Sequence, residues 1–195
     1  FLIYVTPVGS YFKSGLKSLN TIVTDKYHRV ATKSIGFAKA VGNYAGTLLP
    51  YKEIVEDGYD EIIFLNASNE NIIDEARSAN VFVLKGNVLK TPILQGSILP
   101  GITRDSVIKV ASKIFNLDVR EEDVSLDELM NADEAFFTGT AAVIAPIGRI
   151  VHKNIETSLK MSFEESLTRK IRERLIDIHY ENIEDPFGWV IPLER

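Results

Sequence analysis

The feature that most constrains the fold is a hairpin signature in the middle of the chain. Residues 80–85 and 88–93 form two short apolar runs, and Gly86-Asn87 stands between them. A two-residue connection that contains glycine favours the tight turns that join antiparallel strands, because glycine tolerates a positive φ. The pattern therefore predicts an antiparallel hairpin at residues 80–93.

Strand-like and helix-like segments alternate along the rest of the chain. Runs rich in β-branched and aromatic residues predict further strands, and apolar residues on one helical face, together with capping residues, predict helices. The apolar runs are residues 1–8, 16–24, 61–65, 134–137 and 141–147, with a polar turn at 66–71. The predicted helices are residues 38–57, 103–115, a short one capped by Ser125 with Glu128, and a longer one from Ser162 with Glu165 to about Tyr180. Pro50 should kink or split the first helix, and Gly58 should end it.

Composition excludes several classes of protein. The 195 residues are 45% hydrophobic, which is too high for a disordered chain, and no apolar run is long enough to cross a bilayer. The absence of cysteine rules out disulfides, thiolate zinc sites and a cysteine nucleophile. Three scattered histidines lack ligand spacing, so no metal site is expected. A net charge of −5 argues against nucleic-acid binding. We expect a cytoplasmic α/β protein with no membrane or nucleic-acid partner.

Two segments each carry one candidate reactive or charge-stabilising residue. Lys39 lies between small apolar residues just before a predicted helix. A buried lysine amine is a nucleophile that can form a Schiff base, whereas most lysines at such positions are simply solvated. Glu75 lies in residues 73–80, where a carboxylate could hold a heteroaromatic nitrogen protonated; an exposed polar turn is the plainer interpretation.

Two further segments are suited to binding anions. Pro100-Gly101 opens the helix at 103–115, and backbone N–H groups at a helix start attract negative charge. The small, hydroxyl-rich residues 138–142 separate two apolar runs and allow an anion to approach closely. An ordinary helix start and a plain strand connection explain these segments as well. Together, however, an amine, a carboxylate and two anion sites match the needs of pyridoxal 5′-phosphate.

Several longer stretches resemble the branched-chain amino acid aminotransferases, which are class IV, fold-type IV pyridoxal phosphate enzymes. The stretches occur in family order and are AKAVGNYAG (38–46), GYDEIIFL (58–65), DEARSANVF (74–82), ILPGITRDSV (98–107), ADEAFFTGTAAVIAPI (132–147) and DPFGWVIPL (185–193). The resemblance implies an α/β (α+β type) domain of mixed, mainly antiparallel sheets in a barrel-like arrangement with outer helices. It also implies an interdomain segment at 1–14, a large cofactor-binding domain at 15–195 and a small N-terminal domain absent from this chain.

The resemblance assigns roles residue by residue. Lys39 corresponds to the lysine that bonds to the cofactor and shuttles a proton, and Glu75 to the carboxylate that pairs with the pyridine nitrogen. The remaining cofactor-binding residues that it implies are Arg29 near the cofactor, Tyr44 at its phenolic oxygen, and Ile102, Thr103 and Thr140 at its phosphate. The substrate-binding residues that it implies are Thr140 and Ala141 at the substrate carboxylate, and Tyr11 on the substrate side.

The implied reaction is a ping-pong transfer of the amino group of leucine, isoleucine or valine to 2-oxoglutarate. The chain departs from the family at Arg77, where glycine-rich sequence is usual, and at Val8, where some members have an aromatic residue. Arg77 could alter the cofactor's surroundings or bind substrate. A class IV relative such as a D-amino acid aminotransferase or an aminodeoxychorismate lyase is one alternative, and a non-catalytic fragment is another. We also expect a homodimer or a higher homo-oligomer.

Overall fold

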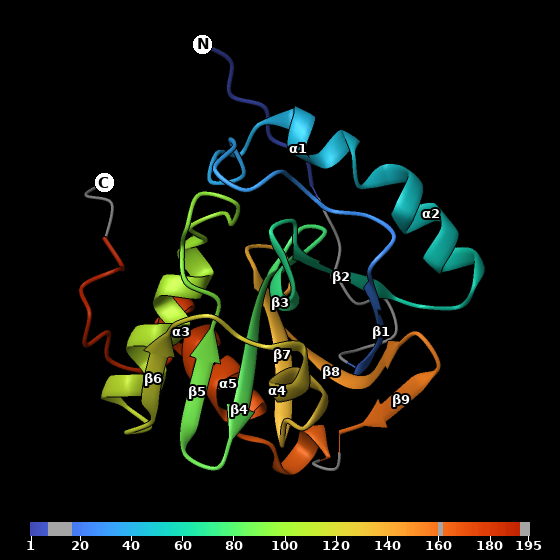
Figure 1. The fold of residues 1–195 in the computed structure, drawn as a ribbon. Coiled ribbons are helices and arrows are strands. Elements are labelled where there is room, and N and C mark those ends of the chain that lie inside the picture. Colours follow the sequence, from blue (N-terminus) through green and yellow to red (C-terminus); the bar gives the residue numbers. More distant parts are fainter. Residues whose placement is uncertain (8–16, 160–161, 192–195) are drawn as a thin grey trace.

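The fold is one mixed sheet with helices packed outside it (Figure 1). A computed structural model describes residues 1–7, 17–159 and 162–191. The strands are β1 (Leu19–Thr24), β2 (Glu61–Asn66), β3 (Asn69–Ala76), β4 (Asn80–Lys85), β5 (Val88–Thr91), β6 (Asp118–Glu121), β7 (Glu134–Gly139), β8 (Val143–His152) and β9 (Ile155–Ser158). The helices are α1 (Val41–Ala45), α2 (Leu48–Glu56), α3 (Ile102–Lys113), α4 (Leu126–Met130), α5 (Leu167–His179) and a 3₁₀ turn at Phe163–Glu165.

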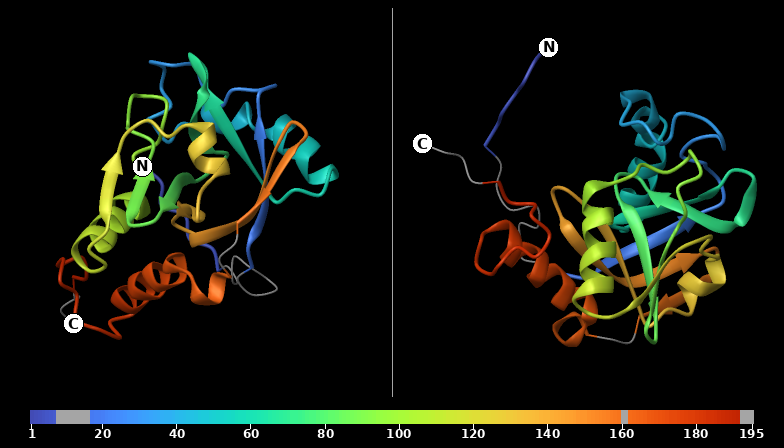
Figure 2. Two further views of the ribbon diagram at one scale, coloured as in Figure 1. Left: turned by 60° about the horizontal axis from the view of Figure 1, so that its bottom comes forward. Right: turned by 90° about the vertical axis from the view of Figure 1, so that its left-hand side faces the viewer.

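The strand order confirms the expected mixed, mainly antiparallel sheet. Within the described residues the order is β3-β2-β1-β8-β7-β4-β5-β6, and β9 pairs with β8. The strand β1 runs parallel to β2 and β8, and β5 runs parallel to β6, while the other pairs are antiparallel. The further views in Figure 2 show the sheet curling into a half-barrel. This curl brings residues that are far apart in the sequence toward one end of the sheet.

Two large apolar clusters hold the sheet to α3, α4 and α5, and a third, smaller one packs Ile54 of α2 against β2. One cluster packs α3 and α5 against β4 and β7, with Phe82 and Phe136 stacked at a centroid distance of 5.1 Å. The other lies on the inner side of the curl and includes Ile63, Ile73 and Phe137, with α4 packed onto it through Leu129. Burying several large apolar side chains on both faces stabilises the curl, at about 1.5–3 kcal/mol for each fully buried side chain.

Most locally encoded elements are confirmed. The Gly86-Asn87 hairpin forms, with Gly86 at φ +56°. Gly58 follows α2 with φ +85°. Ser125 and Glu128 form the expected capping box at the start of α4.

Four sequence expectations are wrong. Residues 1–7 are not a strand, because no described segment pairs with them, and Phe1 to Val5 are exposed. The first helix divides at Gly46-Thr47 rather than at Pro50, which lies in the first turn of α2, where its missing N–H costs no helical hydrogen bond. The cap of α5 is Ser166, which accepts from the Arg169 N–H, and not Ser162. The polar turn at 66–71 is shorter than expected, because β3 begins at Asn69.

Among the described helices, none is long and apolar enough to cross a membrane. The predicted boundary between residues 14 and 15 and the candidate residue Tyr11 both lie outside the described residues. The domain division therefore stays a prediction.

Candidate functional site

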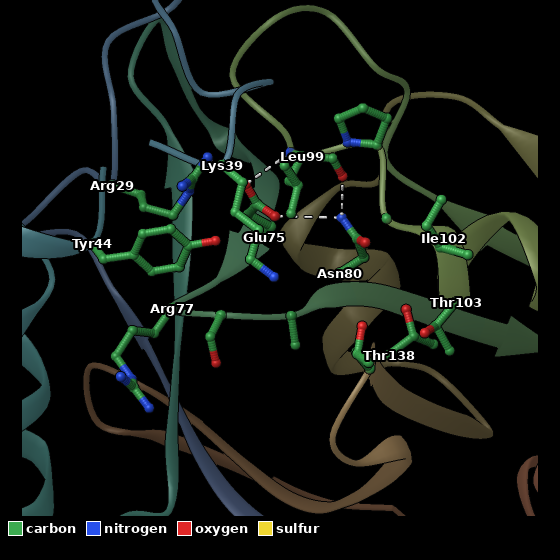
Figure 3. A pocket seen from close by; sticks show the side chains of 16 residues that line it. Arg29, Lys39, Tyr44, Glu75, Arg77, Asn80, Leu99, Ile102, Thr103 and Thr138 are labelled. Carbon is green, nitrogen blue, oxygen red and sulfur yellow. Dashed lines mark hydrogen bonds and ion pairs between the residues drawn. The ribbon is translucent and has the colours of Figure 1, made fainter. Parts of the chain in front are cut away.

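A single cavity of about 190 Å³ collects the predicted cofactor residues. Figure 3 shows their side chains entering it from several elements. Arg29 and Lys39 come from the segment between β1 and α1, Tyr44 from α1, and Glu75 from β3. Ile102 and Thr103 lie at the start of α3, and Thr140 follows β7. The whole cofactor-binding set named from the sequence thus lines one space.

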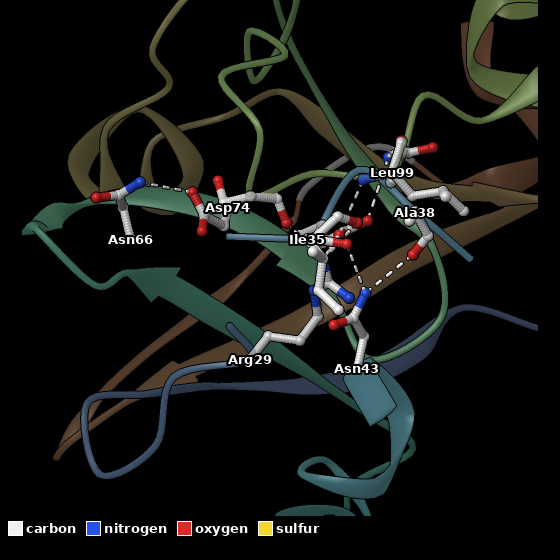
Figure 4. Close-up of polar contacts among 11 residues, drawn as sticks. Arg29, Ile35, Ala38, Asn43, Asn66, Asp74 and Leu99 are labelled. Carbon is white, nitrogen blue, oxygen red and sulfur yellow. Dashed lines mark hydrogen bonds and ion pairs between the residues drawn. The ribbon is translucent and has the colours of Figure 1, made fainter. Parts of the chain in front are cut away.

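Lys39 lines this cavity from a loop that is held by hydrogen bonds from a neighbouring side chain. The Asn43 side-chain amide donates to the carbonyl oxygens of Ile35 and Ala38, each at 2.9 Å (Figure 4). The Lys39 side chain is nevertheless exposed. Of the two interpretations that the sequence leaves open, a buried lysine and a solvated one, the structure shows the solvated lysine, because the loop places Lys39 where solvent still reaches it.

Glu75 is buried at the inner end of the cavity, with a relative exposure of 3%. It forms an ion pair with Arg29, accepts from the Leu99 N–H at 3.1 Å and accepts from the Asn80 amide at 3.3 Å. The plainer sequence interpretation, an exposed polar turn, is therefore wrong at this residue. Strand β3 carries the carboxylate inward, where three donors fix its orientation.

Burial controls the ionisation of Glu75. Desolvation raises the pKa of the Glu75 carboxyl to about 8, and the charge of Arg29 opposes that rise without cancelling it. Burial thus favours the protonated carboxyl in the ligand-free chain, and the ion pair with Arg29 favours the carboxylate. A positively charged ring nitrogen beside Glu75 would favour the ionised carboxylate and would form an ion pair with it.

The start of α3 forms a cradle suited to an anion. Gly101 is the N-cap residue, and within the described chain no side chain caps the first turn, so its N–H groups remain available. A Cβ atom at Gly101 would lie 2.3 Å from Asn80 Oδ1, so any larger residue there would displace the Asn80 side chain, whose amide donates to Glu75 and to the Leu99 carbonyl oxygen. Ile102 and Thr103 directly follow, as the sequence predicted.

Thr138 and Asn80 are two site residues that the sequence reasoning did not assign individually. Thr138 is 2% exposed, and its hydroxyl has no hydrogen-bond partner among the described residues. It lines the cavity beside Thr103 (Figure 3). A buried hydroxyl without a partner is costly, so this atom fits a bound oxygen-rich ligand. The hydroxyl-rich stretch at 138–142 was the available signal for Thr138.

A second cavity of about 230 Å³ shares a wall with the first. Lys39, Thr138 and Thr140 line both spaces. The second cavity adds Ala141, the predicted substrate-side residue, and a mainly apolar lining of Leu19, Phe137, Ala142 and Ala145 together with Glu61. The amine of Lys39 therefore lies between a polar space and a largely apolar one.

The burial of Glu75 makes ligand-free stability depend on pH. The pKa is raised in the folded chain from 4.5 to about 8, so between pH 4.5 and 8 the folded state holds a proton that the unfolded state has released. The contribution of Glu75 to the free energy of unfolding is therefore full below pH 4.5 and is lost as the pH rises to 8. Between pH 4.5 and 8 the free energy of unfolding should fall less in Glu75→Gln than in the wild type, and the difference should be about 2–4 kcal/mol.

Urea unfolding at several pH values measures this effect. Glu56→Gln is the control, because Glu56 is exposed on α2. Parallel pH profiles for the wild type and Glu75→Gln would contradict the prediction.

Comparison with known proteins places this geometry in a family. The family model for amino-transferase class IV matches residues 2–150. A chloroplastic branched-chain amino acid aminotransferase 2 from Humulus lupulus is 38% identical over 193 residues, which cover 99% of this chain and 47% of the relative. The chain thus spans about half the length of that relative.

Solved structures match the fold as well. The branched-chain aminotransferase from Thermoproteus uzoniensis, solved with norvaline, superposes with a TM-score of 0.82 at 34% identity, covering 96% of this chain and 59% of the other. The branched-chain amino acid aminotransferase from Thermobaculum terrenum in its PLP-form superposes with a TM-score of 0.77 at 31% identity. The match covers 86% of this chain and 52% of the other.

The curled mixed sheet with outer helices is the fold-type IV aminotransferase architecture. With the family model matching three quarters of its length, the chain belongs to the class IV aminotransferase family.

Proposed function

We propose that this chain carries the cofactor site of a pyridoxal phosphate-dependent aminotransferase that acts on branched-chain amino acids. The observation that supports the proposal most is the convergence of Lys39, Glu75 and the start of α3 on one cavity. An amine, a carboxylate and an anion cradle are the three groups that an aldehyde, a pyridine nitrogen and a phosphate require. The similarity to branched-chain aminotransferases supports the substrate class.

Pyridoxal phosphate would supply the electron-accepting ring that stabilises charge when the substrate Cα–H bond breaks. The protein's own groups then have defined tasks. Lys39 Nζ would hold the cofactor through its aldehyde carbon and would move the substrate proton. Glu75 would keep the ring nitrogen protonated, and Arg29 holds the Glu75 carboxylate in place. Tyr44 lines the same cavity and would donate to the phenolic oxygen.

Substrate recognition would use the wall between the two cavities. Backbone N–H groups at Thr140 and Ala141 would bind the substrate carboxylate, while the apolar lining of the second cavity would hold the branched side chain. Such a lining distinguishes substrates by about 1–3 kcal/mol per methylene. The amino group would pass to the cofactor and then to 2-oxoglutarate in a ping-pong cycle.

Rates with L-leucine and D-alanine test this function in the complete protein that contains the chain. Turnover of L-leucine with 2-oxoglutarate supports the proposal. Faster turnover of D-alanine would replace it with the D-amino acid alternative. A protein that stays colourless with pyridoxal phosphate would favour the non-catalytic alternative.

We also propose that the protein forms homo-oligomers. Apolar side chains are exposed on α1 and α2, including Val41, Leu48 and Leu49. Large apolar side chains exposed on two consecutive helices are typical of an interaction surface.

The orphaned hydroxyl of Thr138 gives a prediction about phosphate binding. We expect Thr138→Val to raise the dissociation constant for pyridoxal phosphate about 10-fold or more, because a hydrogen bond to a charged oxygen is lost. The dissociation constant for pyridoxal, which lacks the phosphate, should be unchanged. Absorbance titration measures both.

Two further variants complete this test. Thr138→Ser should keep wild-type affinity, since it keeps the hydroxyl. Thr21→Val is the control, because Thr21 is also buried with an unpartnered hydroxyl in the described chain but does not line the cavity. An equal loss of affinity for pyridoxal and pyridoxal phosphate in Thr138→Val would contradict the assignment.

A further inference from the structure

Arg77 is a cation at the cavity rim that the proposed chemistry leaves without a task. It lies in the turn between β3 and β4, two residues after Glu75, and it lines the same cavity as Lys39 and Tyr44. Figure 3 shows its guanidinium at the edge of the group, turned away from the Glu75 carboxylate. A positive charge at the mouth of a substrate site affects which ligands bind there.

The contacts of Arg77 hold the side chain without satisfying its donors. The guanidinium carbon lies 4.0 Å from the ring centroid of Tyr51 on α2, in cation–π geometry. Its Nε is 3.9 Å from Glu61 Oε1, which is too far for a hydrogen bond. That Nε is buried, and the guanidinium donates no hydrogen bond to any residue that the structure describes. An arginine has five N–H donors, so its capacity for a planar anion is intact.

The other two cations that line this cavity, Arg29 and Lys39, have other roles. Arg29 forms the ion pair with Glu75 and donates to the carbonyl oxygens of Gly36 and Ser97. Lys39 supplies the reactive amine in the proposed function. Arg29 keeps one buried donor without a partner, its Nε, but its guanidinium is fixed on Glu75, whereas the Arg77 guanidinium is bonded to no described carboxylate or carbonyl oxygen at hydrogen-bond distance.

We propose that Arg77 binds the second carboxylate of a dicarboxylic substrate, such as glutamate or 2-oxoglutarate. This inference rests on the proposed transamination, in which one site must accept an apolar side chain in one half-reaction and a carboxylate-bearing side chain in the other. A guanidinium matches a carboxylate in bidentate geometry. Arg77 is thus a specificity residue of the dicarboxylate half-reaction.

The resting position of Arg77 explains how both kinds of side chain can be accepted. While the guanidinium lies on Tyr51, its charge stays at the first cavity and outside the second, which would hold the apolar side chain. Its neighbour Glu61 lines that second cavity, so Arg77 rests next to the space that a substrate side chain would enter. The long contact to Glu61 is weak enough to be exchanged for a substrate carboxylate. Rotation of the flexible arginine side chain then brings the donors to the ligand.

Separate half-reactions of the complete protein, loaded with pyridoxal phosphate, test the proposal. The visible absorbance of the lysine-linked cofactor is followed while L-glutamate or L-leucine is added. We expect Arg77→Met to raise the apparent dissociation constant for L-glutamate about 10- to 100-fold. The constant for L-leucine should stay within about 2-fold, because methionine keeps the apolar stem and removes only the charged fork.

Matched variants separate recognition from general effects. Lys52→Met removes one positive charge from the same helix as Tyr51 but from an exposed side chain, and it should leave both constants unchanged. Arg77→Lys should restore part of the glutamate affinity. The variants must keep the absorbance of the lysine-linked cofactor, which reports an intact site.

Each other outcome overturns the inference. An equal change for both amino acids in Arg77→Met would show that the residue only supports the turn, and no change would show that it has no role in recognition. A wild type that reacts with L-leucine but not with L-glutamate would overturn the inference and leave the L-leucine half of the proposed function intact. A wild type that reacts with neither would overturn the proposed function itself.

Discussion

Replacement of Lys39 with alanine should reduce amino-group transfer about 1,000-fold or more. The amine is the group that would bond to the cofactor aldehyde and move the proton, and the loss of a nucleophile that also serves as base is among the largest single-residue effects in enzymes. Lys39 lies on the wall shared by both cavities, so its amine would reach a cofactor in one and a substrate in the other from one position. The rate of spectral change with L-leucine measures the effect.

Lys52→Ala is the control for this variant, because Lys52 is exposed on α2 and lies outside both cavities. The control should keep wild-type rates and colour. A Lys39→Ala protein that still turned yellow with pyridoxal phosphate and reacted at the wild-type rate would exclude Lys39 from the chemistry.

Replacement of Glu75 with glutamine should slow the half-reaction about 100-fold or more. The carboxylate is fixed by Arg29, Leu99 and Asn80, so it would stabilise positive charge on a ring nitrogen without reorganising. Glutamine keeps the shape and removes the charge. Cofactor binding should persist, since the phosphate cradle and Lys39 are unchanged, and the rate of spectral change reports the loss.

The neighbouring residue provides a matched control for Glu75→Gln. Asp74 is also buried, at 4% exposure, but it accepts a hydrogen bond from the Asn66 amide and does not line the cavity (Figure 4). Asp74→Asn should keep the wild-type rate. Equal rates for Glu75→Gln and the wild type would show that the ring nitrogen needs no carboxylate at this position.

The elements that the sequence predicted well are those specified by neighbouring residues. The hairpin at Gly86-Asn87, the left-handed Gly58 and the Ser125 capping box depend on backbone conformations that a few adjacent residues determine. The four segments singled out from the sequence line one cavity in the structure, and their cofactor and anion roles stay predictions.

The errors arose where distant parts of the chain decide the structure. Residues 69–76 are mostly polar at their start, and β3 forms because it pairs with β2 and buries Ile73 and Ala76. Ser162 and Ser166 are both acceptable caps locally, and Glu134, which accepts from the N–H groups of Leu167 and Thr168, helps α5 to begin at Leu167. The exposure of Lys39 likewise depends on which segments cover the rim, and local sequence does not encode that.

The roles of Asn80 and Thr138 were also beyond local sequence. Their strands β4 and β7 pair so that these two residues face each other in the ladder. This register places the Asn80 amide on Glu75 and the Thr138 hydroxyl at the junction of the two cavities. Only the paired sheet shows that they belong to one site.

Borohydride reduction followed by peptide mapping identifies the lysine that bonds to the cofactor. Incubation with pyridoxal phosphate and reduction should fix the cofactor to one lysine, and mass spectrometry identifies which. We expect a single labelled peptide, with the pyridoxyl group on Lys39 and labelling suppressed by excess inorganic phosphate, which would compete for the proposed cradle at Ile102 and Thr103. Labelling spread over surface lysines, or a Lys39 peptide that remains unmodified, would contradict it.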